Sequence, residues 1–339
     1  MQTSRELVYR TLNFTGPERV PRQLWYLPWA EYNYPEQSAR IRRDFPDDIV
    51  ISPGFEKEPP RVTGQQYEVG EFIDAWGCKF INIHRGVIGE VKEPLIKGDR
   101  WEDRDALRLP AEYLTVDRDK VNAFCRSTDR FVLGNPNVNP FERMQFIRGS
   151  ERLYLDLAVK SREMLEVLEQ IHDFFCRLFT VWAETEVDGL MFADDWGAQR
   201  GLLINPKMWR EIFKPLYRDY IEIAHRHGKK AFMHSDGDIL EIMPDLIDLG
   251  LDALNSQIFC IGLEELRPFR GKITFWGELD RQWLLPHGSR QDIENAVRAV
   301  KQNLWADGGC IAQCEFSAGT NPDNVYAAFE VWNKILDEG

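Results

Sequence analysis

Short runs of β-branched and aromatic residues alternate along the chain with longer segments in which apolar residues recur every three or four positions. This alternation predicts βα units arranged around a parallel sheet. Eight runs have the character of strands: 23–26, 49–52, 131–134, 190–193, 230–233, 253–255, 273–276 and 311–313. Eight parallel strands suffice to close a barrel, so the sequence predicts an α/β fold with a single (β/α)8 TIM barrel.

Helix signals lie between these runs. Asn205-Pro206 and Asn321-Pro322 each place a capping side chain directly before a proline, which is typical of a helix start. Ser289 with Asp292 resembles a capping box. Apolar residues recur at helical spacing from 163 to 182. These segments are predicted to form helices that cover the outside of the barrel.

One segment, at about 71–94, departs from the βα pattern. Its partly alternating character and its glycines at 86 and 89 predict a hairpin excursion rather than a barrel strand. No internal repeat, low-complexity stretch or linker interrupts the chain. We therefore expect residues 1–339 to form one barrel domain that carries this excursion.

Composition narrows the functional classes. Hydrophobic residues make up 43% and charged residues 29% of the chain, which is ordinary for a globular protein. The formal net charge of −13 disfavours nucleic acid and anionic membranes as partners. No segment has the pattern of a secretory signal or a membrane span. The six cysteines are scattered, which favours reduced thiols and a cytoplasmic location.

Polar residues follow several of the predicted strands, where the active sites of TIM barrels lie. They are Asp194-Asp195, His234 with Asp236, Gln257, Glu278, and Cys314 with Glu315. Each has an ordinary structural explanation, since a strand-end Asp often caps a helix and a buried Cys often only packs. Their convergence on one rim nevertheless predicts a site with both acid–base and metal-binding groups.

The spacing His234-x-Asp236 lets an imidazole and a carboxylate point to the same side just beyond a strand. With Cys314, and with Glu278 or Glu315 nearby, this set suits Zn²⁺ and leaves one position open for catalysis. The neighbouring carboxylates Asp194 and Asp195 could form an acid–base pair. Of these two, Asp194 is the better catalytic candidate, because Asp195 more plausibly caps a helix and faces solvent.

Four stretches of sequence carry a resemblance to a known family. They are "DGLMFADDWGAQRGLLINPKMWREIFKP" with "HGKKAFMHSDGDILEIMPDLIDLGLDALNSQ", "ITFWGELDRQWLLPHGS", "GGCIAQCEFSAGTNPDNV" and "FIDAWGC". Together they resemble the uroporphyrinogen decarboxylase superfamily over essentially the whole chain. The resemblance implies a TIM barrel, and it implies one of two chemistries.

The decarboxylase branch uses no cofactor and holds substrate carboxylates with an arginine-rich amino-terminal segment. Here that segment reads "VPRQLWYLPWAEY", which keeps Arg22 but replaces the next expected arginine by apolar and aromatic residues. The other branch comprises zinc methyltransferases that work with corrinoid proteins and carry His-x-Cys and a further Cys. Here His234 and Cys314 match that pattern, and Asp236 replaces the middle cysteine.

The resemblance therefore favours a zinc-dependent methyltransferase that moves a methyl group between a small methylated substrate or thiol and a corrinoid protein. It implies His234, Asp236 and Cys314 as metal ligands and Asp194 and Glu278 as catalytic groups. Substrate contacts are expected from Arg22, Trp25, Asp195, Gln199, Asn255 and Gln257. The alternatives are a metal-free decarboxylase of uroporphyrinogen or a related acid and a non-catalytic component that binds a corrinoid or small molecule. Barrels of this family often pair, which makes a homodimer an expectation.

Overall fold

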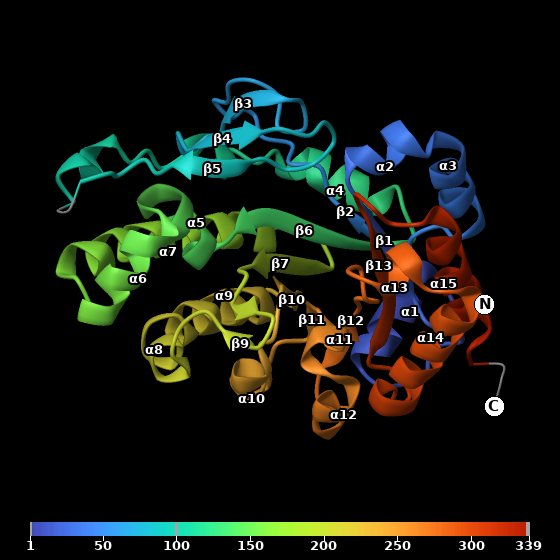
Figure 1. The fold of residues 1–339 in the computed structure, drawn as a ribbon. Helices are drawn as coiled ribbons and strands as arrows, with labels where there is room; N and C mark the ends of the chain where they lie inside the picture. The colour runs from blue at the N-terminus through green and yellow to red at the C-terminus, as the bar shows by residue number, and fades with distance from the viewer. Residues whose placement is uncertain (1, 99–100, 337–339) are drawn as a thin grey trace.

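The computed structural model describes residues 2–98 and 101–336, and its centre is a nearly closed barrel of eight parallel strands (Figure 1). The strands follow the order β1-β13-β12-β11-β10-β7-β6-β2. The two outermost strands approach each other, since the Asp48 amide donates to the Arg22 carbonyl at 2.8 Å. All eight predicted strands are present: β1 Arg22–Tyr26, β2 Ile49–Ile51, β6 Phe131–Val138, β7 Gly189–Ala193, β10 Lys230–Ser235, β11 Ala253–Ser256, β12 Thr274–Trp276 and β13 Cys310–Phe316.

Successive side chains of each strand point alternately into the barrel and out toward the helices, so the core has an inner and an outer part. Inward side chains such as Phe131, Phe232, Trp276 and Ile311 fill the barrel, whereas their strand neighbours pack beneath the helices. Both faces of these strands are therefore buried, which is why they read as continuous apolar runs.

The helices cover the outside of the barrel, and their ends agree with the capping signals. Ser289 and Asp292 form the predicted capping box, and Asn205 and Asn321 each accept a hydrogen bond at a helix start. The helices are α1 Ser4–Leu12, α2 Pro28–Asn33, α3 Pro35–Asp44, α4 Arg118–Arg126, α5 Pro140–Arg148, α6 Ser150–Val159, α7 Arg162–Ala183, α8 Pro206–Ile212, α9 Lys214–Arg226, α10 Met243–Asp248, α11 Ile258–Ile261, α12 Leu263–Leu266, α13 Leu284–His287, α14 Arg290–Leu304 and α15 Pro322–Lys334. Among the described residues, no helix is both long and apolar enough to cross a membrane.

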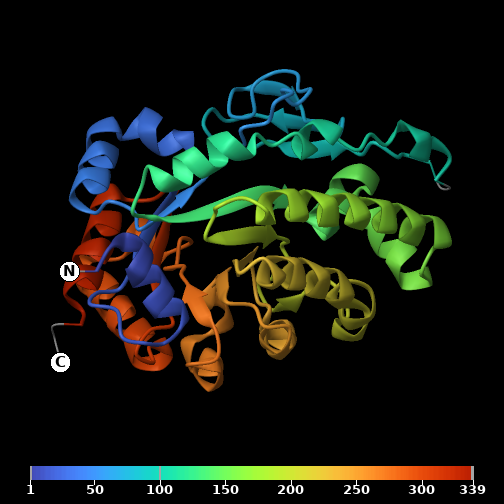
Figure 2. The same cartoon turned by 180° about the vertical axis from the view of Figure 1, so that it is seen from behind.

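The excursion predicted at about 71–94 contains one strand more than a hairpin. It is a three-stranded antiparallel sheet of β3 Gly70–Ile73, β4 Lys79–Asn82 and β5 Glu90–Glu93 (Figure 2). Arg143 of α5 joins this sheet to the barrel through an ion pair with Asp74 at 2.6 Å. A further two-stranded ribbon, β8 Gly197–Ala198 with β9 Gly201–Leu202, follows β7.

Candidate functional site

His234 lies near the carboxyl end of β10, and its ring is held in one orientation. It pairs in register with Asn255 on β11, whose Oδ1 lies 2.6 Å from the imidazole Nδ1. The Asn255 amide nitrogen donates to the carbonyl of Trp276, so Oδ1 is left as the acceptor and Nδ1 carries the hydrogen. This arrangement leaves the Nε2 lone pair of His234 free to bind a cation or accept a proton.

Two carboxylates face that nitrogen. Asp195, after β7, lies 3.4 Å from His234 Nε2, and Asp236, after β10, lies 3.6 Å from it. One ligand atom from each of the three residues lies within 4.8 Å of the others. Oδ1 of Asp236 is buried and has no hydrogen-bond partner among the described residues. An unpartnered carboxylate oxygen and an imidazole nitrogen with a free lone pair are donors that divalent cations bind, and with Asp195 as a third donor these residues fit a metal ion.

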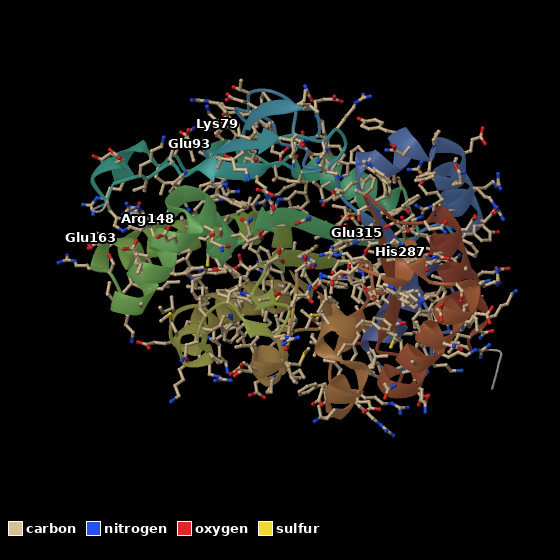
Figure 3. The ribbon with its side chains drawn as sticks, in the orientation of Figure 1. Lys79, Glu93, Arg148, Glu163, His287 and Glu315 are labelled. Atoms are coloured by element: carbon tan, nitrogen blue, oxygen red, sulfur yellow. The ribbon has the colours of Figure 1, made fainter. Side chains whose placement is uncertain are left out.

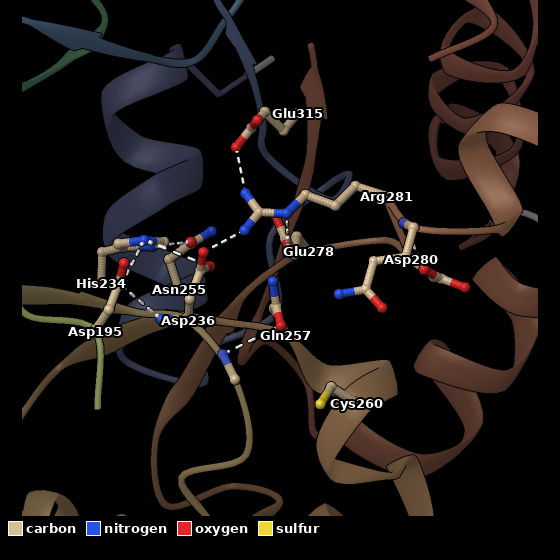
Figure 4. A network of polar contacts seen from close by, with 12 residues as sticks. Asp195, His234, Asp236, Asn255, Gln257, Cys260, Glu278, Asp280, Arg281 and Glu315 are labelled. Carbon is tan, nitrogen blue, oxygen red and sulfur yellow. Dashed lines mark hydrogen bonds and ion pairs between the residues drawn. The ribbon is translucent and has the colours of Figure 1, made fainter. Parts of the chain in front are cut away.

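Arg281 connects the remaining carboxylates, as Figure 4 shows. Its guanidinium pairs with Asp236, with Glu315 at 2.6 Å and with Glu278 at 3.3 Å. One cation thus contacts three carboxyl groups, and with Asp236 and Glu315 ionised the network keeps a net negative charge. Sequence reasoning missed Arg281, because a single arginine in the loop before α13 has no distinguishing pattern.

Glu278 is the most buried carboxylate of this network, with 2% of its surface exposed. Burial raises the pKa of Glu278 to about 8; Asp236 and Glu315 add to the rise and Arg281 opposes it. Its Oε2 has no hydrogen-bond partner among the described residues. A carboxyl group that keeps its proton at neutral pH can act as an acid.

Two cavities flank the network. The smaller, about 270 Å³, is lined by Glu278, Arg281, Gln199, Gln257 and Cys260, among others. The larger, about 930 Å³, is lined by the polar groups of His234, Glu315, Asp47 and Arg130 and by many aromatic and apolar side chains, among them Trp25, Tyr26, Tyr67, Phe124, Ile49, Ile51, Ile88 and Met191. Figure 3 shows Glu315 in the middle of the molecule, whereas Lys79, Glu93 and Glu163 lie at its periphery. The larger cavity has the size and the apolar lining of a small-molecule site.

The predicted substrate contacts are distributed between these cavities. Trp25 lines the larger one, and its ring lies 5.3 Å from that of His234. Gln199 and Gln257 line the smaller one, where Gln257 also accepts a hydrogen bond from the Gly237 amide. Asn255 is fully buried and both ends of its amide are engaged, so it positions His234 instead of contacting a substrate.

Asp194 does not have the catalytic position expected of it. It is fully buried, and its two oxygens accept hydrogen bonds from the amides of Phe141 and Glu142 and from the Tyr217 hydroxyl. Burial raises the pKa of Asp194 to about 8, although the hydrogen bonds from these donors lower it. Asp194 therefore caps the start of α5, and of the two aspartates Asp195 is the one that faces His234.

Arg22 and Cys314 also differ from their predicted roles. Arg22 begins β1, at the opposite end of the strand from the site, and its guanidinium donates to the Pro46 carbonyl and to Asn333. Cys314 is buried in the outer core, on the same face of β13 as Cys310 and Ala312. Because adjacent residues of a strand face opposite ways, Glu315 points toward Arg281 and Cys314 points away. Cys314 is absent from the cluster of candidate ligands around His234.

Glu142 is a second group that sequence reasoning missed. It lies in the first turn of α5, and burial raises its pKa well above its ordinary value, with Asp195 and Asp194 adding to the rise. The sequence Asn139-Pro140 is a helix-start signal that would have placed this carboxylate at the rim.

The comparisons with known proteins agree with this fold. The sequence model of the family described as Uroporphyrinogen decarboxylase (URO-D) matches residues 74–335. A methyltransferase from Methanosarcina mazei has a similar structure, with a TM-score of 0.72 at 14% identity, over 99% of this chain and 100% of that chain. A B12-independent methionine synthase from Shewanella sp. W3-18-1 is more distant, with a TM-score of 0.45 at 12% identity, over 66% of this chain and 67% of that chain. No curated protein matches the sequence significantly.

Proposed function

The chain belongs to the uroporphyrinogen decarboxylase (URO-D) family, and we propose that within this family it is a zinc-dependent methyltransferase that works with a corrinoid protein. It would move a methyl group between a small methylated compound or thiol and the corrinoid. The observation that carries the proposal is the free Nε2 of His234 facing Asp195 and the unpartnered oxygen of Asp236. The likeness to the methyltransferase from Methanosarcina mazei supports the fold on which this site is built.

The ligand set differs from the one expected from sequence. His234, Asp236 and Asp195 would hold the ion, and Cys314 would not. Two carboxylates and one imidazole form a harder site than a thiolate site, which favours an oxygen-bearing substrate over a thiol. When bound, the zinc would act as a Lewis acid that stabilises the anion left after the methyl group departs.

The protein's own groups would supply orientation and protons. Asn255 fixes the tautomer of His234, and Arg281 offsets the charge of Asp236 and Glu315. The aromatic side chains of the larger cavity would hold a small, largely apolar compound beside His234. Glu278, whose pKa is raised to about 8, would hold a proton at neutral pH on the other side of Arg281.

One observation favours the alternative, decarboxylation without a metal. Arg281 and a protonated Glu278 are a cation and an acid side by side, which could hold a substrate carboxylate and supply a proton after the carbon dioxide leaves. Arg281 is already paired with the carboxylates of Asp236 and Glu315, however. The larger cavity offers the cation Arg130 against Asp47 and Glu315, which is too little positive charge for a polyanionic tetrapyrrole. The balance of charge therefore favours methyl transfer.

The test begins with metal content. Protein purified without added metal is analysed for zinc, alongside the variants His234→Ala and Asp236→Asn and the control His287→Ala, on α13. We expect each site variant to lose one zinc per chain and the control to lose none. Methylation of reduced cobalamin by methoxy-aromatic compounds or methylamines, followed by the cobalamin spectrum, should then depend on His234.

Two results would contradict the proposal. One is release of carbon dioxide from uroporphyrinogen that survives chelation and the His234→Ala change. The other is binding of cobalamin or of the methylated compound with no methyl transfer under any of these conditions, which would favour a binding component instead of an enzyme.

A further inference from the structure

A second group of potential ligands lies outside the barrel, where α7 and α9 run side by side (Figures 1 and 2). His172 and Cys176 are one helical turn apart on α7, and Asp219 comes from α9. His172 Nε2 lies 3.1 Å from an oxygen of Asp219 and 3.5 Å from the sulfur of Cys176. One ligand atom from each of the three lies within 4.8 Å of the others.

We propose that His172, Cys176 and Asp219 bind a zinc ion that joins α7 to α9, separate from the site at the barrel mouth. Imidazole, thiolate and carboxylate are the three side-chain ligands that Zn²⁺ takes in proteins. Zinc bonds of about 2.0 Å to nitrogen and about 2.3 Å to sulfur place tetrahedral ligand atoms about 3.5 Å apart. The observed separations of 3.1 and 3.5 Å come within a few tenths of an ångström of that spacing.

The geometry favours an ion over a nucleophilic relay. In a Cys–His–Asp relay, the thiol and the carboxylate contact opposite nitrogens of the ring. Here Asp219 contacts Nε2 at 3.1 Å and the Tyr220 hydroxyl contacts Nδ1 at 3.0 Å, so both ring nitrogens already have oxygen partners. The Cys176 sulfur lies beside the ring, 3.5 Å from Nε2 and 3.7 Å from Nδ1, and is not aligned with the nitrogen opposite Asp219.

The surroundings suit a structural site. Tyr220 contacts the second ring nitrogen of His172, the position at which zinc-bound histidines are held by an outer partner. The other oxygen of Asp219 lies 3.4 Å from Arg218, which leaves Oδ2 for the metal. The His172 side chain is 13% exposed, so the ion would be largely shielded while keeping a path to solvent. Binding would release the thiol proton of Cys176 to solvent and leave the thiolate on the metal.

Cobalt separates the two sites, because only this one contains sulfur. Chelated protein is titrated with Co²⁺, and we expect a thiolate-to-cobalt absorption in the near ultraviolet that accounts for one cobalt per chain, whereas cobalt at the barrel mouth, whose ligands lack sulfur, adds nothing to this band. Cys176→Ser and His172→Asn should abolish this band, and excess Zn²⁺ should remove it from the wild type. His234→Ala, which disables only the barrel-mouth site, should leave the band intact, as should the thiol control Cys260→Ser.

The variant Asp219→Asn serves as a milder test, since this side chain is 39% exposed and its change leaves the helix pair intact. It should weaken cobalt binding and keep the circular dichroism of the wild type. A band that persists in Cys176→Ser, or its absence in folded wild-type protein, would overturn the proposal. If wild-type protein bound no metal at the barrel mouth but gave the band, the proposed function would be refuted and this site would stand.

Discussion

Replacing Asp194 by Ala should destabilise the fold, whereas replacing its neighbour Asp195 should weaken the metal site. Asp194 is fully buried and is the acceptor for two backbone amides and the Tyr217 hydroxyl, at 3.1, 2.8 and 2.6 Å. Each buried donor left without an acceptor costs about 1–3 kcal/mol, so a loss of about 3–9 kcal/mol is expected for the three together.

This free energy converts into a measurable shift in Tm. Unfolding entropy is about 2.1 cal/mol/K per residue, or about 0.7 kcal/mol/K for a chain of 339 residues. The expected change for Asp194→Ala is therefore a fall in Tm of about 4 to 13 °C. Asp194→Asn, which keeps one acceptor oxygen, should fall by less.

The assay pairs two measurements on each variant, namely thermal unfolding followed by circular dichroism and zinc affinity by competition with a chelator. Asp195→Ala is the matched control, because its side chain is 40% exposed and faces His234. It removes one part-buried acceptor, that of the Asp236 amide, so it should lower Tm less than Asp194→Ala does and weaken zinc binding at the mouth strongly. If Asp194→Ala kept the wild-type Tm but lost activity, the capping role would be wrong and the catalytic role expected from sequence would be restored.

Three further predictions follow from the site. The pKa of Glu278 is raised from 4.5 to about 8 in the folded state, so the Glu278 carboxyl keeps its proton more tightly in the folded than in the unfolded chain. Its contribution to the free energy of unfolding is fully present below pH 4.5 and is lost as the pH rises through 8. Glu278→Gln should therefore flatten the decline in stability between pH 5 and 9 seen by urea denaturation, and an unchanged slope would contradict the burial argument. Asn255→Ala removes the partner of His234 without removing a ligand and should weaken metal binding about 10- to 100-fold, measured by chelator competition; equal affinity would mean that the ring needs no support. Cys314→Ala should leave the zinc content unchanged in elemental analysis, because its side chain packs in the outer core; loss of zinc would show that Cys314 is a ligand.

Sequence was sufficient for the fold and for the rim of the barrel. Apolar runs of strand length alternating with helical periods predict βα units regardless of how the chain packs, and all eight predicted strands are present. Polar residues at strand ends reach the same rim because parallel strands point the same way. From that rule alone His234, Asp236 and Glu278 were predicted to lie at one rim, and the structure places them in one network.

Tertiary structure decided which neighbour in each pair faces the site. Barrel strands are buried on both faces, so their sequences do not alternate and give no sign of which side chains point inward. On β13 it is therefore Glu315 and not its neighbour Cys314 that faces the site. After β7, Asp194 accepts from the α5 amides, and its neighbour Asp195 faces His234. Arg281 could be recognised only in the folded structure, because its position is set by carboxyl groups that follow three different strands, namely those of Asp236, Glu278 and Glu315.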